Sequence, residues 1–239
     1  MTEKNRKNIV IKIGGSLLFN KDKTILSEII IEFCDIIKEA NDFGNIVVIC
    51  GGGILARVYI NAVREFGGNE ALCDTFGIDF SRINSRLIIA NLGDHAYPQV
   101  PKSIEELSSA KLSQKIIVMG GLQPGQSTTS VALEVAEFIN ADEIIILTDV
   151  DGIYDKDPKK FEDAQLLKHL NYNQIQDLII KLSDEKQAAA GEYRIFDAVS
   201  LQIIKRSKIN VRVMSGIDLH AFRDYWNGKE DITCTIISD

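Results

Sequence analysis

A glycine triplet beside a basic side chain is a candidate for phosphate binding, and one lies at Gly51–Gly53. It follows the apolar run Ile46–Cys50 and precedes a helical pattern over Ile54–Phe66. Such a turn leaves backbone N–H groups free for an anion. Arg57 lies about one helical turn in, so its side chain can reach back over the glycines. The group predicts a phosphate site, although three glycines between strand and helix are also compatible with tight packing alone.

Three other apolar runs end in turns of similar chemistry. Ile9–Ile13 leads into Gly14-Gly15-Ser16, and Ile116–Met119 leads into a segment of glycines and hydroxyls that ends at Thr129. Glu143–Leu147 leads into a turn with acids, lysines and a tyrosine. The carboxyl ends of parallel strands share one edge of a sheet, where ligands bind. Four such turns together therefore predict one phosphate-binding site.

Basic residues near these turns could supply positive charge. They are Lys12, Arg57, Lys156, Lys159 and Lys160. Lys12 could equally be an edge-strand lysine that faces solvent. The histidines lie away from the turns, and no Ser-His-Asp or Cys-His arrangement is apparent, which disfavours nucleophilic hydrolysis. The Walker and Rossmann glycine patterns are absent. Glycine amides with lysines fit phosphoryl transfer, in which positioning and charge stabilisation supply most of the catalysis.

The elements that must position these residues alternate between strand and helix, which predicts a parallel sheet with right-handed crossovers. Further strands are expected at Val211–Met214 and Thr233–Ile237. Expected helices cover Thr24–Asn41, Ile54–Phe66, Ala71–Asn91 (in one piece or in two around Gly77), Ile104–Ser109, Val131–Ile139, Asn173–Leu182, Phe196–Lys208 and Leu219–Trp226. The segment Ser183–Arg194 is expected to be a loop and is a candidate lid or interface. One domain over residues 1–239 accounts for the pattern.

Composition excludes several classes of protein. The chain has 239 residues and a formal net charge of −7, which argues against a nucleic-acid-binding protein. Its four cysteines are widely spaced, so zinc is disfavoured and a reducing compartment fits. Apolar runs are too short to span a membrane, and the polar start shows no signal-peptide core. The expected location is the cytoplasm.

Five stretches resemble the amino acid kinase superfamily, and within it the archaeal-type uridylate (UMP) kinases. They are IVIKIGGS at 9–16, VVICGGGILARVYI at 47–60, MGGLQPGQSTTSVA at 119–132, LTDVDGIYDKDPKK at 147–160, and AAAGEYRIFD with IIKRSKI near the C-terminus. The resemblance covers nearly the whole chain. The second and third stretches favour uridylate kinases over kinases with other acceptors.

The resemblance implies an α/β fold, a three-layer αβα sandwich with a central, mainly parallel sheet of about eight strands. It implies an N-terminal lobe of about 1–140 on the acceptor side and a C-terminal lobe of about 141–239 on the ATP side. It also implies transfer of the ATP γ-phosphoryl group to UMP with Mg²⁺, a role in pyrimidine nucleotide biosynthesis on the way to CTP, and a homohexamer. Nucleic acid polymers and membranes are not expected partners.

Site residues follow from the same resemblance. The catalytic residues would be Lys12, Arg57 and Lys160, of which Lys12 matches the family's phosphate-bridging lysine. ATP would be bound by Gly15, Ser16, Gly53, Arg57, Thr148, Asp149, Tyr154 and Asp157. UMP would be bound by Gly52, Asp74, Leu122, Gln123, Pro124, Gly125, Gln126, Ser127 and Thr128, with Asp74 on the ribose. No residue is assigned as a dedicated metal ligand.

Three positions depart from the family's pattern. Ser130 stands where many members have an acid that orients the catalytic lysines. Asp149 replaces a frequent Asn, and Asp197-Ala198 replaces a frequent Asp-Pro. Two alternatives to UMP kinase activity stay open at this point: a kinase of the same superfamily with another acceptor, and a non-catalytic nucleotide or oxyanion storage protein on the same fold.

Overall fold

The structure is a computed structural model that describes residues 7–39, 43–184 and 195–239. It contains one seven-stranded sheet in the order β3-β2-β1-β4-β6-β7-β5. Its strands are β1 (Lys7–Ile13), β2 (Phe43–Cys50), β3 (Ile117–Met119), β4 (Glu143–Thr148), β5 (His169–Leu170), β6 (Asn210–Ser215) and β7 (Thr235–Ile237). All neighbours pair in parallel except β6 and β7, which are antiparallel. The mainly parallel sheet is confirmed, with seven strands in place of about eight.

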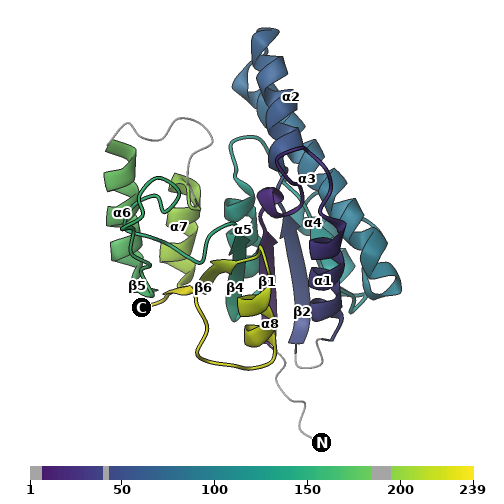
Figure 1. The fold of residues 1–239 in the computed structure, drawn as a ribbon. Helices are drawn as coiled ribbons and strands as arrows, with labels where there is room; N and C mark the ends of the chain where they lie inside the picture. Colours follow the sequence, from purple (N-terminus) through teal and green to yellow (C-terminus); the bar gives the residue numbers. More distant parts are fainter. Residues whose placement is uncertain (1–6, 40–42, 185–194) are drawn as a thin grey trace, which may run out of the picture.

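Helices cover both faces of the sheet, as Figure 1 shows. They are α1 (Ser27–Lys38), α2 (Gly53–Glu65), α3 (Glu70–Leu92), α4 (Ile104–Lys111), α5 (Thr128–Ile139), α6 (Tyr172–Asp184), α7 (Ala198–Ser207) and α8 (His220–Trp226), with 3-10 turns η1 (Gly15–Leu17) and η2 (Gly93–His95). One core packs α4, α5, α6 and α7 against the sheet. The other packs α1, α3 and α8 against the opposite face. The predicted three-layer sandwich is therefore confirmed.

Side-chain alternation places Lys12 on one defined face of β1. Ile9, Ile11 and Ile13 enter the core beneath α1 and α8, whereas Val10 enters the core beneath α5. Because successive strand residues point to opposite faces, Lys12 shares the α5 face with Val10. Its register partners are Ile49 on β2 and Ile146 on β4. The lysine thus lies inside the sheet, which excludes the edge-strand interpretation.

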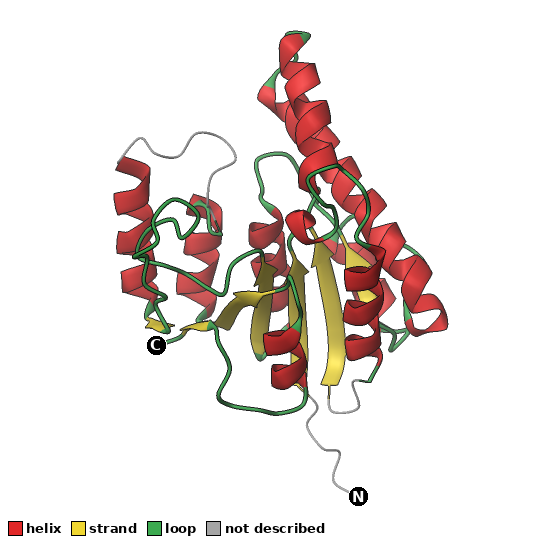
Figure 2. Ribbon diagram, in the orientation of Figure 1, coloured by secondary structure: helices red, strands yellow, loops and turns green. Residues whose placement is uncertain are grey.

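The order of the strands reverses direction between β1 and β4. From β1 the chain adds β2 and then β3 on one side, and from β4 it adds β6 on the other. Crevices outside the carboxyl ends of strands at such a switch point are where open α/β sheets bind ligands. Figure 2 shows loops gathered beyond the carboxyl ends of β1 and β2. The expected lobe boundary near residues 140 and 141 falls on the connection that leads into β4.

Several expected elements differ from the observed ones. Helix α3 runs unbroken for 23 residues through Gly77, because its packing against α2 on one side holds the helix across the glycine. Strand β5 was not predicted, since two residues are too short to show a pattern. Residues 183 and 184 end α6, and the rest of the candidate lid, 185–194, lies outside the described residues.

Candidate active site

Two glycine turns touch each other at the carboxyl ends of β1 and β2. A Cβ added to Gly15 would lie 2.5 Å from Cα of Gly53 and 2.9 Å from the carbonyl carbon of Gly51. Gly53, the first residue of α2, has φ of +74°, a conformation that glycine adopts without strain. The tight-packing interpretation is thus correct for these glycines. The phosphate interpretation is compatible with it, because close packing brings both sets of backbone N–H groups to one place.

Helix α3 holds the Gly51–Gly53 turn after β2 through hydrogen bonds from Asn84. Asn84 is 2% exposed, and its Nδ2 donates to the carbonyl oxygens of Gly51 (2.7 Å) and Gly52 (3.2 Å). The sequence predicts that most of the polar residues Asp74, Asp79, Arg82, Asn84 and Arg86 form a solvated or subunit-contacting face. That prediction is wrong for Asn84, which is buried together with Ser81 and Ser85 of the same helix. Their i, i+3 and i+4 spacing, in line with the apolar Ile88 and Leu92, was the available signal for a buried polar stripe.

The loop after β3 is held by α3 as well. Arg82 donates from Nε to the carbonyl of Gly121 (3.1 Å) and from Nη2 to that of Leu122 (3.2 Å). Ser81 Oγ accepts from the N–H of Gly121 at 2.7 Å. Asp74, predicted to bind the UMP ribose, accepts from the N–H of Gly125 through Oδ2 at 2.8 Å. The structure thus brings Asp74 to the loop with which it was predicted to act.

Other residues of this loop have separate local roles. Gln123, Pro124 and Gly125 are exposed, whereas the Leu122 side chain packs against the core beneath α5. Gln126 Nε2 donates to Glu134 at 3.0 Å. Ser127 is the N-cap of α5, which begins at Thr128 and not at Val131 as predicted. The exposed part of the loop and the start of α5 therefore form the accessible surface.

The Lys12 side chain lies close to the glycine turn that follows β1. Its Nζ lies 3.7 Å from the position of a Cβ on Gly14, and Ser16 Oγ lies 3.5 Å from the same point. Burial lowers the pKa of the Lys12 ammonium group to about 8, and the nearby Asp149 carboxylate partly opposes that shift. A largely buried cation at a strand's end is poorly solvated, so an incoming phosphate would be a favourable partner.

The turn after β4 brings charged residues, Asp149 among them, close to Lys12. Burial would raise the pKa of Asp149, but its ion pair with Lys159 outweighs this and holds the pKa below the usual range. Thr148 Oγ1 donates to Asp149 Oδ1 at 3.3 Å. Asp157 accepts from the N–H of Lys159 at 2.9 Å, and Tyr154 donates to Asp151 at 3.3 Å. Lys159 thus joins this group, although Lys160 was the predicted catalytic residue.

Two predicted cationic residues are solvent-exposed. Arg57 is exposed in the first turns of α2, and Lys160 is exposed in the turn that follows Asp157. The backbone N–H of Lys160 donates to the Asp157 carbonyl at 3.1 Å. Both side chains are on accessible surface, so their predicted roles at the transferring phosphate remain predictions.

Ser130, which departs from the family's acid, has a carboxylate partner from another element. Its Oγ donates to Asp197 Oδ1 at 2.8 Å, and Asp197 also accepts from the N–H of Ser200 at 2.7 Å as the N-cap of α7. Although burial would raise the pKa of Asp197, hydrogen bonds from Ser127, Ser130 and Ser200 hold it below its usual range. The carboxylate therefore joins the starts of α5 and α7 and anchors Ser127 at the end of the loop.

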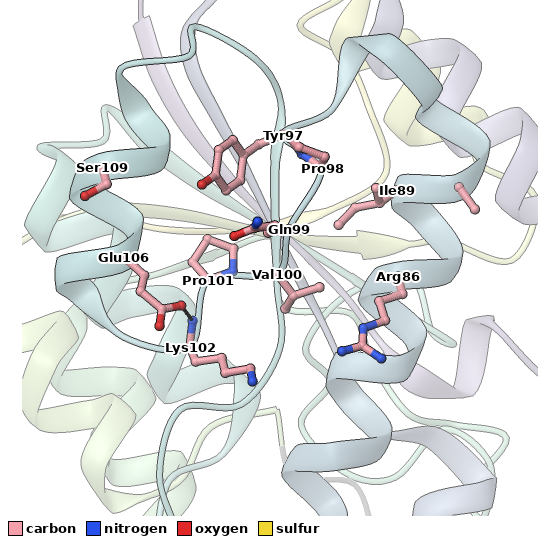
Figure 3. A pocket seen from close by; sticks show the side chains of 11 residues that line it. Arg86, Ile89, Tyr97, Pro98, Gln99, Val100, Pro101, Lys102, Glu106 and Ser109 are labelled. Atoms are coloured by element: carbon pink, nitrogen blue, oxygen red, sulfur yellow. Dashed lines mark hydrogen bonds between the residues drawn. The ribbon is translucent and has the colours of Figure 1, made fainter.

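A cavity of about 660 Å³ lies elsewhere, between α3, α4 and the connector at 97–102. In Figure 3, Arg86 of α3 and Lys102 of the connector occupy opposite walls. None of the predicted site residues lines it. We place the candidate site at the strand ends and not in this cavity, because the cavity shares none of the glycine turns or charges described above.

Glycine turns, a half-buried lysine and a capped loop at the switch point of a mainly parallel sheet are typical of an α/β protein that binds phosphate groups at its strand ends. A family model described as the amino acid kinase family matches residues 7–215. The chain belongs to that family.

Uridylate kinases are among its relatives. The chain is 41% identical over 222 residues to a uridylate kinase of Methanobrevibacter smithii, covering 93% of this chain and 96% of the relative. It is 35% identical over 234 residues to the uridylate kinase of Sulfolobus acidocaldarius, covering 97% and 99%. The crystal structure of uridylate kinase from Archaeoglobus fulgidus superposes with a TM-score of 0.81 at 33% identity, covering 97% of this chain and 100% of that one.

Proposed function

We propose that this protein is a UMP kinase, which transfers the γ-phosphoryl group of ATP to UMP and yields ADP and UDP. The observation that carries the proposal is the convergence of the turns at Gly15, Gly51–Gly53 and Gly121 around one edge of the sheet. The similarity to uridylate kinases over nearly the full length of the chain supports UMP as the acceptor. Neither alternative acceptor kinases nor storage proteins are favoured by a specific feature of the site.

The two substrates would occupy the two sides of the switch point. ATP would bind across the turns after β1 and β4, with Gly15, Ser16 and Gly53 at its phosphates and Thr148 to Asp157 at the adenosine. UMP would bind against α3 and the loop 122–128, with Asp74 on its ribose. The N-terminal lobe, 1–140, would serve the acceptor and the C-terminal lobe, 141–239, would serve ATP.

The reaction would be a direct in-line transfer. An oxygen of the UMP phosphate attacks the γ-phosphorus of ATP, and the bond from that phosphorus to the β-γ bridging oxygen of the leaving ADP breaks. Charge that builds on the transferring oxygens would be neutralised by Lys12 and cradled by glycine N–H groups. Arg57 would reach the same group from α2. The protein's contribution is therefore positioning and fixed positive charge.

Mg²⁺ fits this site as a companion of ATP. Among residues 7–39, 43–184 and 195–239, no three His, Cys, Asp or Glu side chains come together as a metal site. Mg²⁺ commonly binds through substrate phosphates and water with only one or two carboxylates, so a full protein cage is not required. Asp149 and the Ser16 hydroxyl supply oxygens at the correct edge. When bound, the ion would neutralise phosphate charge.

We further propose a cytoplasmic homohexamer that acts in pyrimidine nucleotide biosynthesis. Helices α2 and α3 form a hairpin that extends beyond the sheet in Figure 1. Its apolar side chains include Phe66, 84% exposed, and Tyr59, 50% exposed. Contiguous exposed apolar surface is typical of association sites. Sedimentation equilibrium would contradict the hexamer if it gave a monomer.

Four buried cysteines without disulfides fit a reducing compartment, and no described helix is both long and apolar enough to cross a bilayer.

Acceptor choice tests the proposed function. Purified protein with Mg²⁺ and ATP is expected to release ADP fastest with UMP in a coupled assay that also contains CMP, dUMP and acceptor-free reactions. Asp74 and the loop 122–128 are the physical reason, because they offer hydrogen bonds that only a correct nucleotide satisfies. ADP release with UMP no faster than without acceptor, while ATP still binds, would contradict the proposal and favour a storage protein.

A further inference from the structure

Two polar side chains of α3, the buried Asn84 and the half-buried Arg82, contact both substrate turns. Asn84 donates to Gly51 O and Gly52 O, and Arg82 donates to Gly121 O and Leu122 O. The acceptors are backbone carbonyls in every case. The two turns belong to different strands, β2 and β3, and are joined through this one helix.

A hydrogen bond that holds a backbone carbonyl also fixes the direction of the N–H group in the same peptide unit. The described chain contains no cis peptide bond, so each N–H points away from the carbonyl of its own peptide unit. Holding the carbonyls of Gly51 and Gly52 on the α3 side therefore turns the N–H groups of Gly52 and Gly53 to the far side. The Gly14–Gly15 turn lies on that side, because a Cβ on Gly15 would collide with the Gly53 nitrogen.

The same geometry applies to the turn after β3, which contains Gly120 and Gly121. Arg82 holds the carbonyls of Gly121 and Leu122, so the N–H groups of Leu122 and Gln123 point away from α3. Ser81 takes up the remaining N–H of Gly121 at 2.7 Å. A Cβ on Gly120 would lie 2.5 Å from Ser81 Oγ and 2.7 Å from the backbone nitrogen of Arg82, so this turn packs directly against the helix.

We propose that Asn84 and Arg82 are positioning residues that orient the backbone N–H donors of the two substrate turns from one rigid helix. Asn84 aims those of Gly52 and Gly53 at the phosphoryl group in transfer, and Arg82 aims those of Leu122 and Gln123 at UMP. This inference rests on the proposed function. It assigns to α3 the alignment of the acceptor with the donor. Arg82 and Asn84 belong to one unbroken helix of 23 residues, which keeps the two contacts at a fixed separation.

Asn84→Ala tests the first part of the proposal. We expect kcat with UMP to fall about 100-fold, the loss that a misplacement of about 1 Å produces. Calorimetric affinity for a non-hydrolysable β,γ-imido ATP analogue should fall about 10-fold, whereas affinity for ADP, which lacks the γ-phosphoryl group, should change by less than about threefold. Ser85→Ala is the matched control, because Ser85 is buried on the same helix but donates to Ser81 O.

Arg82→Met tests the second part at a less buried position, where the aliphatic stem can be retained. The KM for UMP should rise about 10-fold, with the affinity for the ATP analogue unchanged. This variant also keeps the proposal testable if Asn84→Ala fails to fold.

Two results would overturn the inference: Asn84→Ala turning over UMP like Ser85→Ala, or either variant weakening ADP, the ATP analogue and UMP equally. Wild-type protein is assayed in parallel. An inactive wild type would refute the proposed function itself, and the difference between ATP-analogue and ADP affinities would then still decide the role of Asn84.

Discussion

Replacing Lys12 with alanine should lower kcat for UMP phosphorylation by about 100- to 1,000-fold, the usual effect of removing one fixed charge-stabilising donor. The affinity for ATP should fall much less, by under about 10-fold, because the glycine N–H groups still bind its phosphates. The physical reason is the position of Nζ beside Gly14, where charge would build during transfer. Steady-state kinetics and calorimetric ATP binding separate the two effects.

Lys7→Ala is the matched control, because Lys7 begins the same strand at its opposite end and is exposed. Its kcat should stay within about twofold of wild type. Equal losses of turnover and ATP affinity in Lys12→Ala would mean that Lys12 only binds ATP or supports the fold.

The pKa of Lys12 adds a pH dependence to this result. Burial lowers that pKa to about 8, so ligand-free protein loses the ammonium proton as pH rises through about 8. The kcat/KM for ATP reports ionisations of the free enzyme and should therefore fall above pH of about 8. Stability should move the opposite way, rising between pH 8 and 10.5, because the unfolded chain then binds more protons. Lys12→Arg keeps its charge, so its kcat/KM should lose this alkaline fall.

Gly15→Ala should damage folding and activity together. Its Cβ would lie 2.1 Å from the backbone nitrogen and 2.5 Å from the Cα of Gly53, so one of the two glycine turns must move. We expect a loss of about 2–3 kcal/mol in the free energy of unfolding and a fall of about 100-fold in kcat/KM for ATP. Denaturant unfolding and steady-state kinetics measure the two.

Gly77→Ala provides the contrast at another glycine that faces α2. Its Cβ would meet Ile60 Cδ1 at an ordinary 3.6 Å in the interior of α3. Alanine is the better helix former, so stability should rise by about 0.5–1 kcal/mol. If Gly15→Ala were as stable as Gly77→Ala, the two glycine turns would not be in the contact described.

The sequence was informative wherever the relevant pattern was local. Apolar runs ending in glycine located β1, β2 and β3, and a run ending in Thr148-Asp149 located β4. Together they indicated that the four turns share one edge of the sheet. Those turns are local features, because the residues that build each one are adjacent in the chain. Family resemblance then supplied roles for the turns, and Lys12 proved to lie inside the sheet at the correct end.

Contacts between distant segments could not be predicted in the same way. Arg82 meets Gly121 across 39 positions, and Ser130 meets Asp197 across 67. A polar residue in a helix shows its face by its spacing, but not which turn will cover that face. The missing acid at Ser130 was visible in the sequence, whereas the carboxylate supplied by α7 depends on how α5 and α7 pack.

Transfer of label from [γ-³²P]ATP tests the central claim most directly. The purified protein is mixed with Mg²⁺, labelled ATP and UMP, and the nucleotides are separated by thin-layer chromatography. We expect labelled UDP to form in a one-to-one ratio with ADP and only when UMP is present. Labelled inorganic phosphate without labelled UDP, or ADP formation independent of UMP, would contradict a site in which the glycine turns bring ATP and UMP together.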